Sequence, residues 1–288
     1  MMTKNDKTCW IFGDSFVETN ADLFKSKRTD WYRPWTLLIE DELPDVDTIC
    51  VRGLPGTGVD WAYDEFRKYQ DQMKPGDYLI FVITHPNRFW LFEDRPELSN
   101  VYMLYEGLGL SQGQMNALEG FKKYIDREER GVRFLDIVQS AMNFHATAMQ
   151  LQYVLIPAFP QSGHALFNPW FQVTGSLVES SVFDHCKHNN PSKKELLKAM
   201  EVNGNYITNS PGGTDHRVQH LSWKNHEVLA KKIAHSFMTR EPLELDKGFY
   251  PNVIENQNDW DTYNYQYREV LNQFGNLAPN KRDRFCDA

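Results

Sequence analysis

The chain has 288 residues, of which 41% are hydrophobic, enough for a core in one large domain or two modest ones. Its 39 acidic residues outnumber its 31 lysines and arginines, and a net charge of −8 argues against nucleic acid as a partner. No apolar run reaches the roughly 18 residues of a membrane span, and no basic start precedes an apolar leader, so we expect neither a span nor a signal peptide. The four cysteines form no CxxC pair, which favours a reducing compartment or indifference to redox state.

Four short runs rich in β-branched and aromatic residues predict strands. Each run is nearly continuous in apolar character, as expected for a strand that is covered on both faces. The predicted strands are Thr8–Phe12, Thr48–Val51, Tyr78–Ile83 and Gln152–Ile156.

Apolar residues at three- and four-residue spacing predict helices between these strands. One such stripe runs from Trp35 to Leu43 and a second from Val59 to Met73. A longer helical region covers 112–148, with an expected break at Gly131. A last helix, capped by Ser222, carries the apolar stripe Leu229, Ile233 and Phe237. Strands that alternate with helices predict an α/β fold with a parallel sheet and helices on both faces.

The composition changes after Pro242 to Asn, Asp, Tyr and Gln with few aliphatic residues. We therefore predict a domain over residues 1–240 and a polar, aromatic C-terminal extension over 241–288. Its aromatic residues suit a protein partner or self-association, and ordinary packing of a terminal segment explains them equally well. They are Trp260, Tyr263, Tyr265 and Tyr267.

Polar and glycine-rich segments follow the first three predicted strands, where ligands bind in open parallel sheets. They are Gly13-Asp14-Ser15, the segment 52–58 with the sequence RGLPGTG, and Thr84-His85-Pro86-Asn87-Arg88. A serine hydroxyl, backbone N–H groups and a side-chain amide are the parts of an acyl-transfer site. The base that such a site needs is His220, just before the last helix, with Asp215 near enough in sequence to orient it.

Each of these residues also has a plainer interpretation. The glycine-rich segment could hold a phosphate, although the dinucleotide pattern has its glycines after the first strand. His220 could be structural, and Asp215 could be an ordinary loop residue. The cluster at 184–188, DHCKH, lacks a partner pair at metal-ligand spacing, so we expect a solvated loop and no metal site.

The motifs resemble those of the SGNH hydrolases, also called the GDSL family, over roughly the first 240 residues. They are Gly13-Asp14-Ser15, Gly53-Leu54-Pro55-Gly56, the turn after the third strand, and His220-Leu221-Ser222 followed by Asn225-His226. The resemblance implies a three-layer, flavodoxin-like parallel sheet with Ser15 as nucleophile and His220 as base. It further implies an oxyanion hole formed by the N–H groups of Ser15 and Gly56 with Asn87, and no cofactor.

The chain departs from the family pattern in two places. The third block usually reads Gly-x-Asn-Asp, so either Asn87 is displaced by a residue or Arg88 takes its role. The family's acid usually lies three residues before the histidine, where this chain has Arg217. Either the loop bulges to bring Asp215 into place, or the serine and histidine work as a dyad.

The resemblance implies a serine esterase or deacetylase that hydrolyses an acyl ester. We favour small acyl groups on a carbohydrate because aromatic residues such as Trp170 can stack on sugars, and we expect Asp14, His85 and Arg88 to contact the substrate as well. The alternative is a binding or structural protein whose chemistry has lapsed, such as a virion component, since hydrolases of this type occur in phages. The expected location is cytoplasmic or virion-associated.

Overall fold

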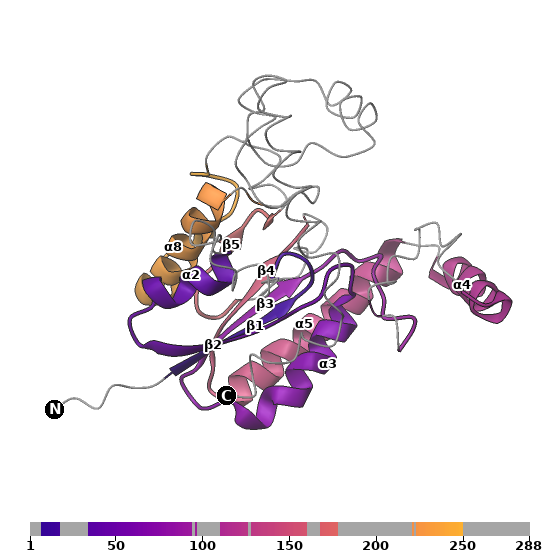
Figure 1. The fold of residues 1–288 in the computed structure, drawn as a ribbon, viewed down its shortest axis with the longest axis horizontal. Coiled ribbons are helices and arrows are strands. Elements are labelled where there is room, and N and C mark those ends of the chain that lie inside the picture. Colours follow the sequence, from indigo (N-terminus) through magenta and orange to yellow (C-terminus); the bar gives the residue numbers. More distant parts are fainter. Residues whose placement is uncertain are drawn as a thin grey trace, which may run out of the picture. The chain divides into compact units, whose positions relative to one another are not determined.

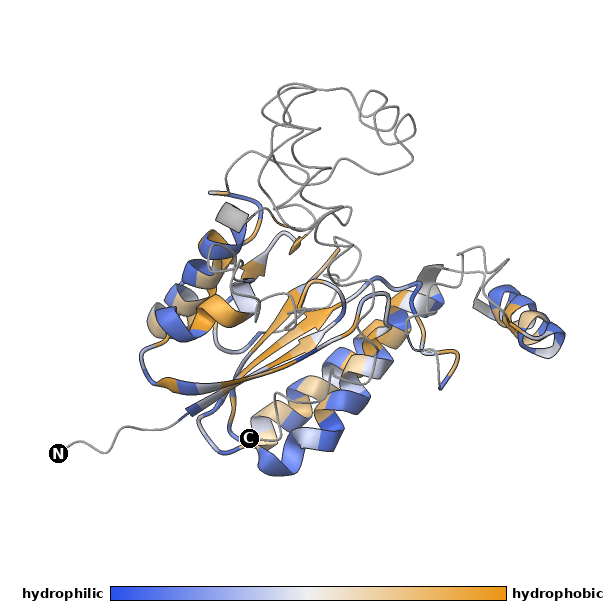
Figure 2. Ribbon diagram, viewed as in Figure 1, coloured by the Kyte–Doolittle hydropathy of each residue, from blue (hydrophilic) through white to orange (hydrophobic). Residues whose placement is uncertain are grey.

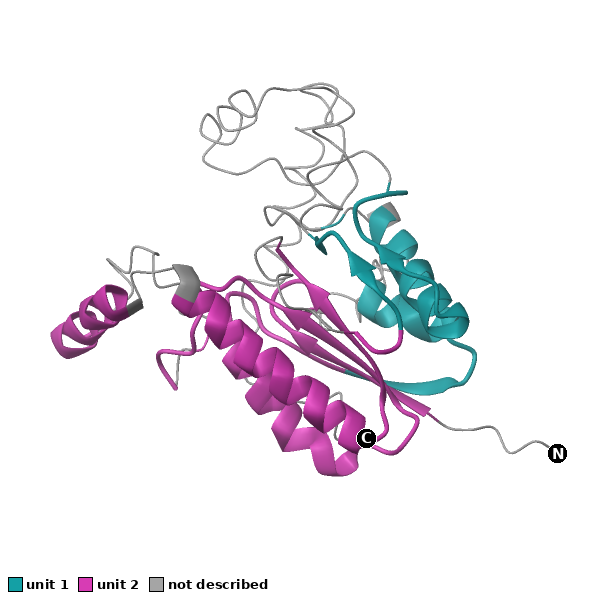
Figure 3. Ribbon diagram, turned by 180° about the vertical axis from the view of Figure 1, so that it is seen from behind, with its two compact units in different colours: residues 1–5, 19–50, 171–288 teal, residues 6–18, 51–170 magenta. Residues whose placement is uncertain are grey.

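The computed structural model describes residues 7–17, 34–93, 96, 110–125, 128–159, 168–177, 221 and 223–249. The chain divides into two compact units, coloured separately in Figure 3. One contains residues 1–5, 19–50 and 171–288, and the other contains residues 6–18 and 51–170. Neither coincides with the predicted division at residue 240, and most of 241–288 lies outside the described residues, so that division stays a prediction.

A four-stranded, all-parallel sheet is the centre of the fold (Figure 1). Its order is β2-β1-β3-β4, and the strands are β1 (Lys7–Gly13), β2 (Val46–Gly53), β3 (Tyr78–Ile83) and β4 (Gln152–Pro157). Every residue of β3 is buried, and its hydrophobic character is plain in Figure 2. All four predicted strands and the parallel α/β class are therefore confirmed.

Two helices, α3 (Val59–Tyr69) and α5 (Glu128–Ala148), contact each other and the sheet. The predicted stripe of α3 is confirmed, because Val59, Ala62 and Phe66 are all buried. The ring of Phe66 meets that of Phe12 edge to face at 5.8 Å, which joins α3 to β1. After α3 the chain makes a short 3-10 turn, η1 (Gln70–Gln72), and the predicted helix ends there.

The predicted break at Gly131 is wrong. The interruption separates α4 (Gln112–Ile125) from α5, and Gly131 lies inside α5. A Cβ at this position would come within 2.4 Å of the Pro86 carbonyl oxygen, so the glycine allows the helix to approach the loop after β3. Packing, and not the end of a helix, explains this glycine.

Asp77 fastens the amino-terminal edge of the sheet. This carboxylate is 3% exposed and accepts hydrogen bonds from the Thr8 N–H at 3.0 Å, the Trp10 Nε1–H at 3.0 Å and the Lys74 N–H at 2.9 Å. Burial, with a smaller contribution from the charge of Asp77, raises the pKa of the neighbouring Cys9 thiol. Asp77 thus ties β1 to the start of β3.

The other unit contains helices α2 (Trp35–Glu42) and α8 (Trp223–Thr239), which pack on each other. Pro34 offers no side-chain cap for α2, and the buried His226 of α8 accepts the Trp35 N–H through Nδ1 at 3.1 Å. Two-residue strands β5 (Val173–Thr174) and β6 (Leu243–Glu244) pair in parallel, and the sequence analysis missed both because so short a strand has no periodicity.

Cys50 is disulfide-bonded, which disagrees with the expectation of a reducing compartment or of indifference to redox state. Cys9 is a buried free thiol. Among the described helices none is both long and apolar enough to cross a membrane.

Candidate functional site

The strand order reverses between β1 and β3, because β2 lies on one side of β1 and β3 on the other. The loops that follow β1 and β2 and the loop that follows β3 therefore leave the sheet from its carboxyl edge on both sides of this point. In open parallel sheets the crevice at such a reversal is the usual place for a ligand. Residues from the loops after β1 and β3 meet here.

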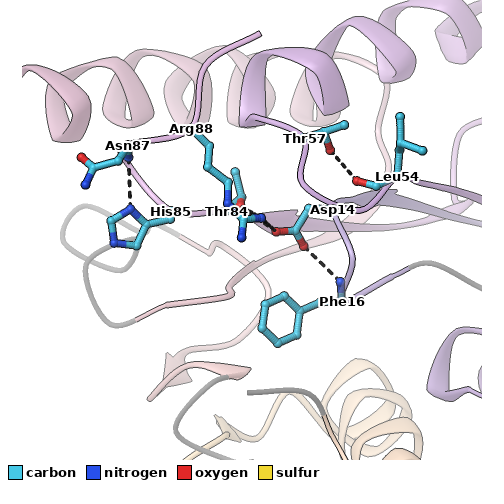
Figure 4. A network of polar contacts seen from close by, with 8 residues as sticks. All are labelled: Asp14, Phe16, Leu54, Thr57, Thr84, His85, Asn87 and Arg88. Carbon is cyan, nitrogen blue, oxygen red and sulfur yellow. Dashed lines mark hydrogen bonds and ion pairs between the residues drawn. The ribbon is translucent and has the colours of Figure 1, made fainter. Parts of the chain in front are cut away.

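Asp14 is the centre of a buried polar network at this edge (Figure 4). Its Oδ2 accepts hydrogen bonds from the Thr84 hydroxyl at 2.7 Å and from Arg88 Nη1 at 2.7 Å. The same Nη1 donates to the Thr84 Oγ1 at 3.2 Å. Asp14 is only 1% exposed and the Arg88 side chain 20%, so this ion pair is largely withdrawn from water. Removing one partner of a buried ion pair destabilises the folded protein by about 3–5 kcal/mol.

The network shapes the turn that carries Ser15. The Asp14 Oδ1 accepts the Phe16 N–H at 3.1 Å, and the Asp14 carbonyl accepts the Val17 N–H at 3.1 Å. Ser15 lies between these bonds and is 6% exposed. The carboxylate predicted to contact substrate is therefore engaged in holding the backbone just after the candidate nucleophile.

The glycine-rich loop after β2 is fitted against the loop after β3. Gly56 has a φ of 81°, in the region that favours glycine, and Thr57 closes the turn by donating its hydroxyl to the Leu54 carbonyl at 2.8 Å. A Cβ on Gly58 would come within 3.0 Å of the Arg88 carbonyl oxygen. The two loops are thus in close backbone contact.

Asp60, at the start of α3, joins these loops by hydrogen bonds. Its Oδ2 accepts the Trp90 N–H at 2.7 Å, and its Oδ1 accepts the Trp61 N–H at 3.0 Å. Burial raises the pKa of this carboxyl group, against the opposing effect of the N–H donors. Asp60 fixes the chain just after Arg88.

His85 and Asn87 face away from the Asp14 network. The Asn87 N–H donates to the His85 Nδ1 at 3.1 Å, which places the proton of a neutral imidazole on Nε2. In Figure 4 the carboxamide of Asn87 points away from Asp14, whereas the side chain of Arg88 points toward it. Of the two residues weighed for the family's third block, Arg88 is the one that reaches the strand-order reversal.

Three aromatic rings lie together after the ends of β1, β3 and β4. The Phe159 ring meets Phe16 at 5.7 Å and His85 at 5.1 Å, edge to face in both cases. The Arg88 guanidinium carbon lies 5.6 Å from the centre of the same Phe159 ring. We call Phe16, His85 and Phe159 the aromatic cluster.

Some predicted site residues lie outside the described residues. These are His220 and Asp215, as well as the capping Ser222 and the cluster at 184–188. Trp170 is half-buried, two residues after Asn168, whose carboxamide pairs with the N–H and carbonyl of Leu155 in β4. No group of three potential metal ligands occurs in the described part of the chain.

The candidate site also includes Thr84, Asp60 and Phe159, for which no role was predicted from the sequence. The register carried a signal for Thr84, because Phe12 pairs with Phe81 and the two strands therefore end almost together. This register places Asp14 and Thr84, which lie just beyond those ends, next to each other. The contacts of Asp60 and Phe159 depend on loop conformation and had no such signal.

A scan of protein-family models and a search of curated proteins both find no match for this chain.

Proposed function

We propose that this chain is a serine ester hydrolase with the three-layer, flavodoxin-like arrangement of the SGNH hydrolases. The observation that carries the proposal is the buried Asp14–Thr84–Arg88 network, which holds the turn of Ser15 at the strand-order reversal. A nucleophile needs a fixed position close to its substrate, and this network supplies one.

In the proposed reaction, His220 removes the proton of the Ser15 hydroxyl as its oxygen attacks the ester carbonyl. The oxyanion accepts hydrogen bonds from the Ser15 and Gly56 N–H groups. The alkoxide leaves with a proton from His220, and water then releases the acyl group from Ser15. Asp215 orients the histidine, or the pair acts as a dyad. The reaction needs neither a metal nor an organic cofactor.

Asn87 is the least supported member of the proposed oxyanion hole, because its carboxamide points away from Asp14 (Figure 4). Loss of an oxyanion donor lowers turnover by a factor on the order of 10² to 10³. Asn87→Ala therefore tests the family assignment directly, and unchanged turnover would remove Asn87 from the site.

The substrate proposed is a small acyl ester, with an O-acyl group on a carbohydrate as the favoured class. Beside the Ser15 turn, the half-buried rings of His85 and Phe159 in the aromatic cluster are consistent with a sugar ring as the leaving group.

The test is reaction with a fluorophosphonate label together with hydrolysis of short-chain p-nitrophenyl esters. We expect wild-type protein to be labelled and to turn over the esters, and Ser15→Ala and His220→Ala to lose turnover. Ser111→Ala is the matched control, because Ser111 is exposed and only caps the start of α4. A wild-type chain that is neither labelled nor active would refute the hydrolase and favour the binding or structural alternative.

A further inference from the structure

The buried network holds the Arg88 guanidinium through one of its three nitrogens. Nη1 makes both bonds of the network, to Asp14 and to Thr84. Nε and Nη2 carry the remaining N–H donors of the fork, and they make no hydrogen bond to the described residues. The side chain is 20% exposed, so these donors belong to a group that is positioned by the protein and still within reach of solvent.

The positive charge of Arg88 acts beyond its ion pair. The pKa of His85 is lowered to about 4, mainly by burial and additionally by the charge of Arg88. The charge of Arg88 therefore acts on His85, a member of the aromatic cluster. Since His85 is neutral above that pH, Arg88 and not His85 carries a positive charge at this position at neutral pH.

The guanidinium lies over an aromatic surface. Its central carbon is 5.6 Å from the centre of the Phe159 ring, and that ring is braced edge to face by Phe16 and His85. An arginine fork over a ring suits a ligand that combines a flat or apolar body with a carboxylate or phosphate. A lone surface arginine would lack both the fixed geometry and the apolar neighbour.

We propose that Arg88, above Phe159, binds an anionic group of the substrate, a carboxylate or a phosphate, next to the turn of Ser15. That the anion belongs to a substrate rests on the proposed function, whereas the anion site itself is inferred from the contacts of Arg88 alone. Combined with ester hydrolysis, it selects acyl esters that carry an acid group close to the scissile bond, such as esters of acidic sugars.

The experiment measures binding of benzoate, phenylphosphonate and neutral benzamide to the full chain by calorimetry at low ionic strength. We expect the wild type to bind at least one anion more tightly than benzamide. Arg88→Lys keeps a cation for Asp14 but loses the fork, and it should weaken that anion roughly tenfold. Arg133→Lys, at an exposed position of α5, is the matched control and should change nothing.

The two anions separate the possible sources, since tighter benzoate indicates a carboxylate and tighter phenylphosphonate a phosphate. Equal binding of benzamide and both anions by the wild type would overturn the proposal without any variant. So would unchanged anion binding in Arg88→Lys. A chain that binds the anion through Arg88 but neither reacts with the label nor hydrolyses an ester would refute the hydrolase and keep the anion site.

Discussion

Gly131 offers a sharp test of how α5 supports the candidate site. A Cβ at Gly131 would lie 2.4 Å from the carbonyl oxygen and 3.0 Å from the carbonyl carbon of Pro86. Both are backbone atoms of the loop that carries Arg88, so no side-chain rotation can relieve the contact. Either the helix or the loop must shift.

The expected magnitude for Gly131→Ala follows from two opposing effects. Replacing glycine by alanine inside a helix stabilises by about 1 kcal/mol. Overpacking against a rigid neighbour costs about 1–3 kcal/mol. The geometry lies at the severe end of this range, so we expect a net loss of roughly 1–2 kcal/mol. Gly120 in α4 is the matched control, because it is exposed and its Cβ would meet nothing within 4 Å.

Urea unfolding followed by far-UV circular dichroism measures this difference. Gly120→Ala should move the midpoint upward and Gly131→Ala should move it downward from the wild type. Labelling of Ser15 should slow only in Gly131→Ala, because Pro86 is two residues from Arg88. A Gly131→Ala midpoint at or above that of the wild type would refute the close approach of α5 to this loop.

Three further outcomes are expected. The folded-state pKa of His85, about 4, lies below the ordinary value of 6.5, so its contribution to stability is full above pH 6.5 and is lost as the pH falls toward 4. His85→Gln should therefore make the unfolding midpoint depend less on pH between 4 and 6.5, and an unchanged pH dependence would contradict the lowered pKa. Asp77→Asn should lower the free energy of unfolding by about 1–3 kcal/mol without slowing the labelling of Ser15. Asp14→Asn should lower both stability and the labelling rate, and equal labelling rates in the two variants would show that Asp14 does not support the site. His226→Phe keeps the bulk but removes the acceptor for the first N–H of α2, so chemical denaturation should show a loss of about 1–2 kcal/mol, and wild-type stability would argue against the cap.

The sheet could be predicted because the sequence of each strand alone carries the pattern that identifies it. Runs such as Tyr78–Ile83 are apolar throughout, and a strand buried on both faces needs no other signal. The stripe from Val59 to Phe66 likewise fixes one face of α3. Local pattern and tertiary packing agree in these segments, so the sequence alone predicts them.

The predictions were incomplete where tertiary contacts decide. Gly131 has the composition of a helix break, but the carbonyl of Pro86, far away in sequence, explains it. The expectation that Asn87 points into the site came from the family pattern, and the loop instead turns Arg88 toward Asp14. Loop side chains take directions that neither periodicity nor spacing encodes.

Asp14 and Asp77, which are both buried at opposite edges of the sheet, show what distinguishes the candidate site from ordinary structure. Asp77 is satisfied by two backbone N–H groups and an indole N–H, all of them neutral donors. Asp14 has a cation among its partners, besides the neutral donors of Thr84 and Phe16. Buried ion pairs add little net stability compared with apolar packing. We infer that the charge of Asp14 serves to position its neighbours: it holds the turn of Ser15 and fixes the Arg88 guanidinium through Nη1. The same residue type thus joins two strands at the edge where the strands begin and, at the edge where they end, holds the turn on which the proposed function rests.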